Sequence, residues 1–357
     1  MATARRQDVR PSLVLRGLPG VGPVRFKEIV EAFGSAADAL ATGGRELGRW
    51  IGSKGLAALR AGRPRRDADV IVRRCRDLGI EITALGLGGY PNRLGDLPDP
   101  PPVLYWKGRL QLLEASCVAV VGSRRATAYG RRVARKLGRF LAESGRPVLS
   151  GMALGVDAEA HWGALPGPTA AVLGSGVDIP APATNRALYE ALLEQGLVLS
   201  TFDPGAPPAP HHFPARNRVI AALADEIVVV EAGMRSGALI TAGIGLDLGR
   251  EVHAVPGPID RPTSAGTNRL IADGAVPLVQ IGDRGSSLAR GNRTGPQDDA
   301  LRALWTRVPG HPVSFDELVE VCGAPPHRIS AGLTRLELLG FITVTADGRF
   351  LRTGGES

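Results

Sequence analysis

Two stretches decide the fold of this chain: Val-Ala-Val-Val-Gly-Ser-Arg-Arg at residues 118–125, and Val-Leu-Ser-Gly-Met-Ala-Leu-Gly-Val-Asp at residues 148–157. In each, an apolar run rich in β-branched residues ends in a glycine turn, and the residues that follow favour a helix. In parallel α/β sheets, a strand that opens into a helix through such a turn presents backbone N–H groups to phosphate. The first turn also carries Ser123 and two arginines, so hydrogen-bond donors and positive charge occur together. This chemistry indicates a phosphodiester or a nucleotide as the ligand.

The composition indicates a globular protein of two or three domains. The 357 residues are 44% hydrophobic and 22% charged, which is ordinary for a folded protein. The formal net charge of +8 and the pI near 10.0 favour a polyanionic partner such as nucleic acid. Charge alone is a weak indication, because arginine-rich composition also follows from GC-rich coding.

Cysteine usage and hydropathy narrow the class of protein further. Three cysteines without a Cys-x-x-Cys pair exclude a disulfide framework and argue against a zinc ribbon. No apolar run approaches the roughly 18 residues of a membrane span, and the first residues lack the apolar core of a signal peptide. The sequence therefore predicts a cytoplasmic protein with no membrane partner.

Residues 1–85 are predicted to form a helical module. Leu-Arg-Gly-Leu-Pro-Gly-Val-Gly-Pro at residues 15–23 is a glycine hairpin, and residues 24–33 follow it with helical spacing. The Gly-x-Gly turn resembles a helix-hairpin-helix, whose turn amides hold a DNA phosphate, and residues 50–56 are a poorer echo of it. A tight turn in a small helical bundle explains the same pattern, so both interpretations stay open.

Residues 86–283 are predicted to form an α/β core with a Rossmann-like, largely parallel sheet. A proline cluster at residues 98–102 precedes a segment in which apolar strands alternate with helical stretches. Near-continuous apolar strands separated by helices are typical of a parallel sheet covered on both faces. The predicted strands are Val118–Val121, Val148–Leu149, Ala170–Leu173, Val198–Leu199, Ile227–Val230 and Val252–Val255.

Residues 284–299 are polar and predict a flexible linker, which is followed by a C-terminal module at residues 300–357. The predicted elements of this module are helices at residues 300–308, 314–321 and 326–339 and a hairpin at residues 341–351. Ser314 and Glu317 form a capping box, and Asp347-Gly348 is a hairpin turn. Three helices and a hairpin are typical of a winged helix, which either reads DNA or serves dimerisation or protein docking.

Four glycine-containing loops each follow a predicted strand, so in a parallel sheet all four should line one carboxyl edge. They begin at Gly122, Ser150, Gly174 and Glu231. Their glycines are expected to let a ligand approach the backbone closely, their serines to donate hydroxyl hydrogen bonds, and Arg124 to supply charge. The residues predicted for this anion site are Gly122, Ser123, Arg124, Gly151, Gly155 and Ser236.

A basic and aromatic segment, residues 211–221, places Phe213 beside Arg216 and Arg218. A ring that stacks on a base, next to cations that neutralise phosphates, is typical of proteins that bind single-stranded nucleic acid. The alternative is a buried ring with arginines that pair with the acidic residues 225–226.

No residue pattern indicates catalysis. Asp157 and Asp178 each end a Gly-Val-Asp triplet. Each is either a catalytic carboxylate or a carboxylate that accepts loop amides or caps a helix, and we expect the second. Ser123 and Ser150 lack a His/Asp pattern, and no Walker lysine motif is present. The adjacent histidines 211–212 are not an obvious metal pair. The sequence therefore predicts no catalytic residue, no metal ligand and no cofactor.

Taken in order, these motifs closely resemble those of the bacterial DNA-processing protein A family (DprA, also called Smf). The resemblance covers roughly residues 91–280 with high specificity, and helical N-terminal and winged-helix C-terminal modules accompany this core in many members. The motifs that carry it are Val-Gly-Ser-Arg, Ser-Gly-Met-Ala-Leu-Gly-Val-Asp, Phe-Pro-Ala-Arg-Asn-Arg-Val-Ile-Ala, Val-Val-Val-Glu-Ala, Ser-Gly-Ala-Leu-Ile-Thr-Ala and Gly-Arg-Glu-Val-His-Ala-Val-Pro-Gly.

The resemblance implies a non-enzymatic protein that binds single-stranded DNA, protects incoming DNA during natural transformation and loads the RecA recombinase onto it. It also implies a homodimer formed through the Rossmann-like core, and a DNA pocket built from the Gly-Ser-Arg turn and the Phe-Pro-x-Arg-Asn-Arg segment. The residues that match this pocket are Gly122, Ser123, Arg124, Phe213, Arg216, Asn217 and Arg218. One departure is Ala181-Pro182, where the family usually has Tyr-Pro, so any contact made by that ring is missing here.

Two other functions compete with this one. Nucleoside-monophosphate phosphoribohydrolases of a related Rossmann-like group carry Pro-Gly-Gly-x-Gly-Thr-x-x-Glu after a late strand, whereas residues 231–239 here lack the diglycine and the downstream glutamate. A regulator of duplex DNA would read it with residues 326–339, which offer His327, Arg328 and Arg335 but are otherwise apolar. The sequence favours the single-strand binder over both.

Overall fold

The computed structural model describes residues 8–44, 46–282, 298–309, 311–338, 341–345 and 348–352. The chain divides into two compact units, residues 1–283 and residues 284–357. Of the predicted linker at residues 284–299, all but the last two residues lie outside the described ranges. Those two residues open the first helix of the second unit.

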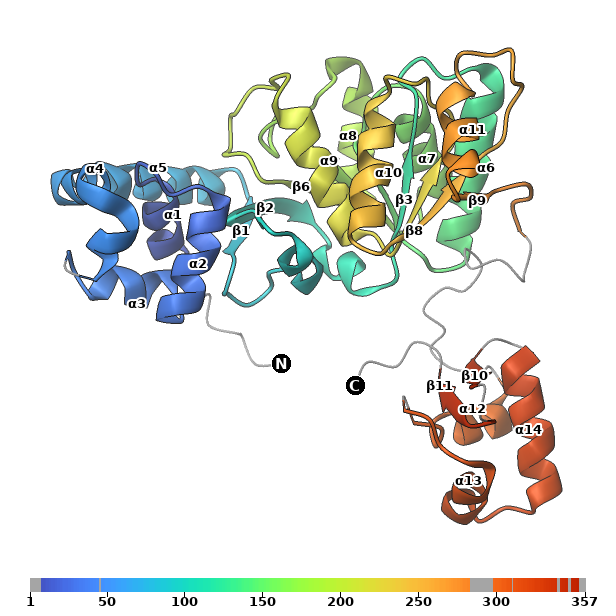
Figure 1. Cartoon of the computed structure of the whole chain (residues 1–357). Coiled ribbons are helices and arrows are strands. Elements are labelled where there is room, and N and C mark those ends of the chain that lie inside the picture. Colours follow the sequence, from blue (N-terminus) through green and yellow to red (C-terminus); the bar gives the residue numbers. More distant parts are fainter. Residues whose placement is uncertain are drawn as a thin grey trace. The chain divides into compact units, whose positions relative to one another are not determined.

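A nine-stranded sheet lies at the centre of the first unit, with the strand order β1-β2-β6-β5-β4-β3-β7-β8-β9 (Figure 1). The strands are β1 (Glu81–Ala84), β2 (Val103–Gly108), β3 (Val118–Val121), β4 (Val148–Ser150), β5 (Thr169–Leu173), β6 (Leu197–Ser200), β7 (Glu226–Val229), β8 (Glu251–Ala254) and β9 (Val276–Pro277). Every neighbouring pair from β6 to β9 is parallel, and β2 is antiparallel to both β1 and β6. This confirms the predicted Rossmann-like, largely parallel sheet, with all six predicted strands present.

The sheet also contains β1, β2 and β9, which the sequence did not predict as strands. β1 and β9 are short, and β1 contains polar residues, so neither has the apolar run that identified the central strands. In the structure β1 pairs with β2, for example Ile82 with Tyr105. The predicted domain boundary between residues 85 and 86 falls between these two paired strands, and the division into domains stays a prediction.

Helices cover both faces of the sheet, and alternation along the strands explains why. The helices of the core are α6 (Ala128–Glu143), α7 (Val156–Ala164), α8 (Arg186–Gln195), α9 (His212–Leu223), α10 (Gly237–Asp247) and α11 (Ala265–Ala272), with short 3-10 helices at Asn92–Asp96, Leu110–Glu114 and Ala183–Asn185. In β5, Ala170 and Val172 belong to the cluster that includes α9 and α10. Ala171 and Leu173 belong to the cluster that includes α8. Successive side chains point to opposite faces, so a strand that is apolar throughout needs helices on both.

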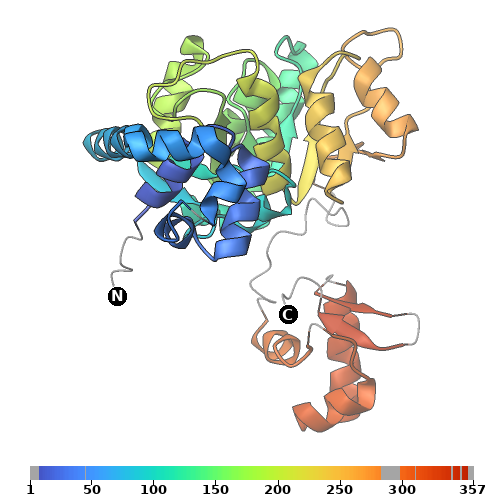
Figure 2. The same ribbon diagram turned by 60° about the vertical axis from the view of Figure 1, so that its left-hand side comes forward.

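The N-terminal helices pack beside the β1–β2 edge of the sheet (Figures 1 and 2). They are α1 (Arg10–Arg16), α2 (Pro23–Phe33), α3 (Ala36–Ala41), α4 (Leu47–Ala61) and α5 (Arg63–Asp77). The predicted glycine hairpin joins α1 to α2, with Pro23 in the first turn of α2. The poorer echo lies inside α4, where Gly52 has a φ of 64° and kinks the helix. Ion pairs from Arg16 to Asp203 and from Arg74 to Asp178 tie the helices to the core.

The second unit is a winged-helix domain, as predicted. It contains α12 (Asp299–Trp305), α13 (Phe315–Cys322), α14 (Pro326–Leu338) and a hairpin of β10 (Ile342–Val344) and β11 (Phe350–Arg352). The capping box of Ser314 and Glu317 is present at the start of α13. Of the predicted hairpin turn, Asp347 lies outside the described residues.

Within the part of the chain that the structure describes, no helix is both long enough and apolar enough to cross a bilayer.

Candidate functional site

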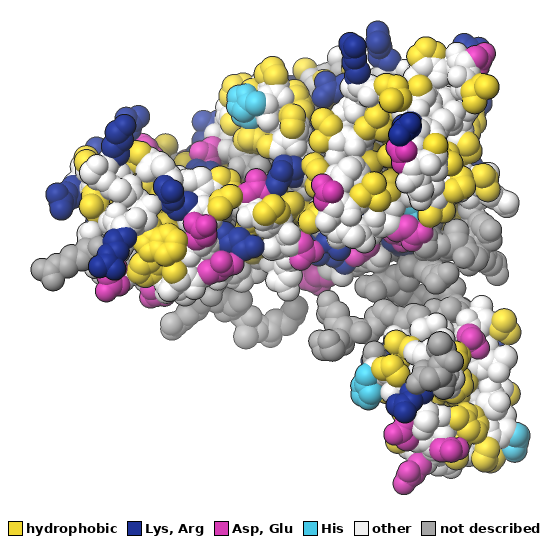
Figure 3. All heavy atoms as spheres, in the orientation of Figure 1, with side chains coloured by type: hydrophobic (Ala, Val, Ile, Leu, Met, Phe, Trp, Pro, Cys, Tyr) yellow, Lys and Arg dark blue, Asp and Glu magenta, His cyan; other side chains and the backbone are white. Residues whose placement is uncertain are grey.

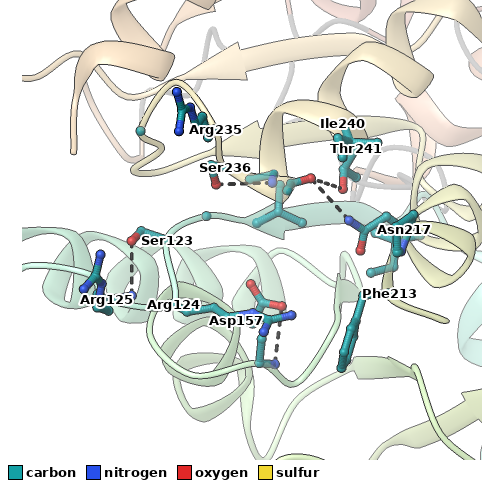
Figure 4. Close-up of a pocket in the computed structure, with 18 of the residues that line it drawn as sticks. Ser123, Arg124, Arg125, Asp157, Phe213, Asn217, Arg235, Ser236, Ile240 and Thr241 are labelled. Carbon is teal, nitrogen blue, oxygen red and sulfur yellow. Dashed lines mark hydrogen bonds between the residues drawn. The ribbon is translucent and has the colours of Figure 1, made fainter. Parts of the chain in front are cut away.

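A pocket of about 620 Å³ opens at the carboxyl edge of the parallel strands. Its walls come from the loops after β3, β4, β7 and β8 and from residues of α7, α9 and α10 (Figure 4). The predicted site residues that line it are Gly122, Ser123, Arg124, Phe213, Arg216, Asn217 and Ser236. The parallel sheet therefore brings residues that are distant in the sequence to one edge.

Ser123 makes three hydrogen bonds that fix the loop after β3, and each of them involves a backbone group. Its N–H donates to the Glu231 carbonyl at 2.7 Å, and its own carbonyl accepts from the Val156 N–H at 3.2 Å. Its hydroxyl oxygen accepts from the Arg125 N–H at 3.1 Å. The loop is held in place by these contacts, while the side chains of Arg124 and Arg125 are exposed.

Glu231, in the loop after β7, holds the start of α6. Its buried carboxylate accepts hydrogen bonds from the Thr127 N–H at 2.8 Å and from the Thr127 hydroxyl at 2.5 Å. The Thr127 oxygen in turn accepts from the Gly130 N–H and caps the helix. A carboxylate at a helix N-terminus is favoured by the helix dipole. We predicted no role for this glutamate, although it stands in the Val-Val-Val-Glu-Ala motif.

The loop after β4 is held by Asp157. Its carboxylate accepts the Gly151 N–H at 3.1 Å and the Ala153 N–H at 3.4 Å, as predicted for a loop-stabilising carboxylate. Burial raises the pKa of Asp157, while a nearby guanidinium and these amides act in the opposite direction. Between the two amides, Met152 has a φ of 55° and its carbonyl accepts from the Asn185 side chain at 2.8 Å. A strained backbone of this kind persists because its surroundings fix it.

Two other groups considered in the sequence also have internal partners. Asp178 accepts the Gly205 N–H at 2.7 Å and pairs with Arg74 at 3.1 Å. The ring of His212 stacks on Phe202, with 3.8 Å between the ring centroids. Both residues therefore contribute to the packing around the site.

Arg216 is buried, which the sequence did not predict. Only 4% of the residue is exposed, and one of its terminal nitrogens donates to the carbonyls of Gly151 and Val172, each at 2.6 Å. Its Nε donates to the Asn217 side chain at 3.1 Å. Burial lowers the pKa of Arg216 to about 10. Because a buried guanidinium needs hydrogen-bond acceptors, this side chain joins the loop after β4 to β5, and little of it remains for a ligand.

Arg218 lies away from the pocket, in contrast to the prediction. Its guanidinium forms an ion pair with Asp99. It lies two positions after Arg216 on α9, so the two side chains leave the helix in different directions. The acidic residues proposed as alternative partners, Asp225 and Glu226, pair with other arginines.

The glycines of the loops face protein atoms, which corrects the expectation that they make room for a ligand. A Cβ on Gly151 would overlap the guanidinium of Arg216. A Cβ on Gly155, whose φ is 78°, would overlap the carbonyl of Ser123, and one on Gly122 would overlap its neighbours on two sides. These positions need glycine because loops and helices pack closely at this edge of the sheet.

Phe213 and Arg124 form the centre of the pocket. The guanidinium carbon of Arg124 lies 4.8 Å from the centroid of the Phe213 ring, within the range of a cation–π contact. The ring is partly exposed. Asn217, one turn further along α9, donates to the Gly237 carbonyl at 3.2 Å and ties α9 to α10. An aromatic face and a cation are therefore available together.

Two further exposed arginines, Arg125 and Arg235, line the same pocket. Figure 4 shows them around the same hollow as Phe213. Both lie in loops that were predicted to line the anion site, but sequence spacing could not tell an exposed arginine from a buried one. Ser236 caps α10 by accepting the Ala238 N–H at 3.3 Å, so the positive end of that helix also faces the pocket.

A space-filling view shows Lys and Arg side chains gathered at the upper rim of the core (Figure 3). The loop after β8 contributes Pro262 and Thr263 to the pocket, which no sequence signal had indicated. Backbone amides, hydroxyls and three exposed guanidiniums around a partly exposed ring suit an anionic ligand with a flat group.

One cluster of metal-ligand type is found among the described residues, at the opposite edge of the sheet. One ligand atom each of Glu226, Glu251 and His253 lies within 4.8 Å of the others. The Arg146 guanidinium contacts Glu226 at 2.8 Å from within the core. A buried cation therefore already neutralises this carboxylate, and the residues fit a structural ion pair better than a metal site.

The fold and the site together define a Rossmann-like protein with an anion-binding edge and a C-terminal winged helix. The chain belongs to the DNA recombination-mediator protein A family, whose model matches residues 81–288. The DprA winged helix domain matches residues 291–348. These matches confirm the resemblance seen in the motifs, and they give the protein a role in DNA processing and recombination.

Individual relatives cover most of the chain. Protein Smf of Synechocystis is 35% identical over 309 positions, covering 74% of this chain and 78% of the relative. A putative DNA processing protein DprA of Mycobacterium tuberculosis is 39% identical over 272 positions, covering 71% of this chain and 70% of the relative.

Two solved structures share the fold. DNA processing protein A of Streptococcus pneumoniae superposes with a TM-score of 0.65 at 31% identity, covering 78% of this chain and 95% of that one. DNA processing protein A of Helicobacter pylori, reported with a single-stranded DNA binding mode, superposes with a TM-score of 0.53 at 31% identity, covering 56% of this chain and 92% of that one.

Proposed function

We propose that the pocket at the carboxyl edge binds single-stranded DNA. The observation that carries the proposal is the exposed guanidinium of Arg124 over the partly exposed ring of Phe213. Base–aromatic stacking is available to any base that is not held in a duplex, and nearby cations neutralise the phosphates. The single-stranded DNA binding mode of the Helicobacter pylori relative supports the same reading.

The pocket residues divide into those that contact DNA and those that position the contacts. Phe213 stacks a base, while Arg124, Arg125 and Arg235 hold phosphates. The capped N-terminus of α10 supplies further N–H donors. Arg216 positions the loop after β4 through its hydrogen bonds to backbone carbonyls, and it supports DNA binding through that loop.

The biological role follows from the family resemblance. We propose a non-enzymatic, cytoplasmic homodimer that protects incoming DNA and loads the RecA recombinase onto it. One observation favours a non-enzymatic role: Asp157, which lines the pocket, is buried and its carboxylate accepts two loop amides. The domains proposed are a helical module at residues 1–85, the core at 86–283, a linker at 284–299 and the winged helix at 300–357.

Fluorescence anisotropy with a labelled oligo-dT of about 30 nucleotides tests DNA binding. The full chain is titrated across a salt series, with duplex of the same length and AMP as competitors. Arg124→Glu is compared with Arg139→Glu, which makes the same charge change at an exposed position on α6 outside the pocket. We expect a preference for the single strand, a steep salt dependence, and loss of binding in Arg124→Glu alone.

Other outcomes identify the competing functions. Competition by AMP without strand preference, together with release of free base, would make the pocket a phosphoribohydrolase site. Preference for duplex DNA that survives Arg124→Glu would move DNA recognition to the winged helix. RecA loading is tested separately, by RecA-dependent strand exchange on DNA covered by single-strand-binding protein, where wild type should accelerate the reaction and Arg124→Glu should not.

A further inference from the structure

A second hollow of about 530 Å³ adjoins the proposed DNA pocket, on the other side of the loop after β3. Arg124 and Arg125 line both. The remaining wall includes Arg131 and Arg135 from α6 and Trp162 from α7. No motif in the sequence singled out this combination, because its residues come from two helices that the sequence does not place side by side.

The two hollows are joined by a third, smaller one. This cavity of about 220 Å³ shares Arg124 and Phe213 with the first hollow and Arg124 and Leu154 with the second. Arg124 therefore borders all three. The three hollows, which we call the groove, therefore adjoin one another from the ring of Phe213, past Arg124, to the ring of Trp162.

Trp162 is exposed although it is the largest apolar side chain available. Its exposed fraction is 39%, and that of Leu154 across the same hollow is 44%. Both lie where a flat apolar group could cover them. Tryptophan is enriched at binding surfaces, where the flat face of its ring packs on a partner.

The backbone beneath Trp162 is rigid, because α6 and α7 cross in close contact. A Cβ on Gly163 would overlap the carbonyl of Arg135, and a Cβ on Gly138 would overlap the carbonyl of Ala160. The side chain before Trp162 is the fully buried His161. The ring is therefore presented from a fixed position, which reduces the entropy lost when a ligand stacks on it.

The charge of the second hollow favours a polyanion over an apolar protein segment. Arg131 and Arg135, four residues apart on α6, both contact Glu159, at 3.8 Å and 2.7 Å. Glu159 is the only acidic residue among the described residues of this lining, against four arginines that include Arg124 and Arg125. Three positive charges therefore remain in excess around the exposed tryptophan.

We propose that the second hollow is a further subsite for single-stranded DNA, in which Trp162 stacks a base beyond the one held by Phe213. The single DNA strand passes over Arg124, and Arg131 and Arg135 neutralise its phosphates between the two stacked bases. This inference rests on the proposed function of the first pocket, and it lengthens the binding site without changing its chemistry.

A length series of oligo-dT, from about 4 to about 20 nucleotides, tests the subsite in the full chain. Wild type, Trp162→Ala and Trp162→Phe are compared by anisotropy, and Leu246→Ala, an exposed apolar residue near the far end of α10, is the matched control. We expect the shortest oligonucleotides that bind to show equal affinity for all variants. With longer ones, Trp162→Ala should lose about fivefold or more, and Trp162→Phe should recover most of the loss.

Tryptophan fluorescence gives an independent readout, since the chain has four tryptophans and only Trp162 lines this groove. Long oligo-dT should quench the emission of wild type, and Trp162→Phe should remove that quenching. Unchanged affinity of Trp162→Ala at every length, or quenching retained in Trp162→Phe, overturns the subsite while short oligonucleotides still bind. If even wild type binds no oligonucleotide, the proposed function of the first pocket fails instead.

Discussion

Arg216 and Arg124 both line the pocket, and their substitution should have opposite consequences. Arg216→Gln removes a buried guanidinium that donates to two carbonyls at 2.6 Å. Glutamine is shorter and cannot keep both contacts. The buried Asp157 carboxylate also loses the nearby positive charge, which lowers the Asp157 pKa against the effect of burial. Breaking a buried charge arrangement by removing one member costs about 3–5 kcal/mol of folding free energy.

Arg124→Gln changes an exposed side chain with no acidic partner among the described residues, so the folding free energy should change by no more than about 0.5 kcal/mol. The substitution should instead weaken the affinity for DNA. The loss of one phosphate contact reduces the slope of log affinity against log salt by roughly one. Arg216 is therefore expected to contribute to stability, and Arg124 to DNA binding.

Differential scanning calorimetry of the full chain, combined with anisotropy across a salt series, separates the two effects. A loss of about 3–5 kcal/mol should lower the melting temperature of the core by about 6 °C or more in Arg216→Gln. Arg124→Gln should melt like wild type. If Arg216→Gln keeps the melting temperature and loses binding with a reduced salt slope, then Arg216 contacts DNA directly, as the sequence motif suggested, and the argument from burial is wrong.

Three further predictions follow from the site and its surroundings. Phe213→Ala should weaken oligo-dT binding about tenfold by anisotropy, since one base stack contributes about 1–3 kcal/mol; unchanged affinity removes the ring from the site. Burial lowers the pKa of His161 from 6.5 to about 3, so the unfolded chain binds a proton that the folded chain does not. Stability should therefore fall by about 1 kcal/mol for each pH unit below about 6, and His161→Gln should flatten this part of a melting temperature profile. Gly155→Ala should destabilise the core by about 2 kcal/mol or more, because it adds an overlap with Ser123 to the cost of a positive φ. In Gly145→Ala, where φ is 72° and the space is open, only the φ cost of about 1 kcal/mol should remain, and equal melting temperatures for the two variants would contradict the overlap.

Sequence patterns were sufficient for the six strands from β3 to β8 and for the edge at which the pocket lies. β3, with Val-Ala-Val-Val, is apolar at every position, and this pattern is typical of a strand covered on both faces. Parallel strands end at the same edge, so the loops after β3, β4 and β7 had to meet there. The capping box at Ser314 and Glu317 likewise fixed the start of α13, because its hydrogen bonds are local.

The roles of individual side chains needed the tertiary structure. Arg216 and Arg218 stand two residues apart in one motif, yet the first is buried against carbonyls and the second pairs with Asp99. Their partners lie far away in the sequence, and the direction in which each leaves α9 depends on how that helix packs on the sheet. The same holds for Trp162, which joins arginines of α6 only because two glycines let the helices cross closely. Local hydrogen bonding and hydrophobic periodicity depend on residues close together in the chain, so they can be predicted from the sequence. Burial and long-range contacts exist only once the helices have packed.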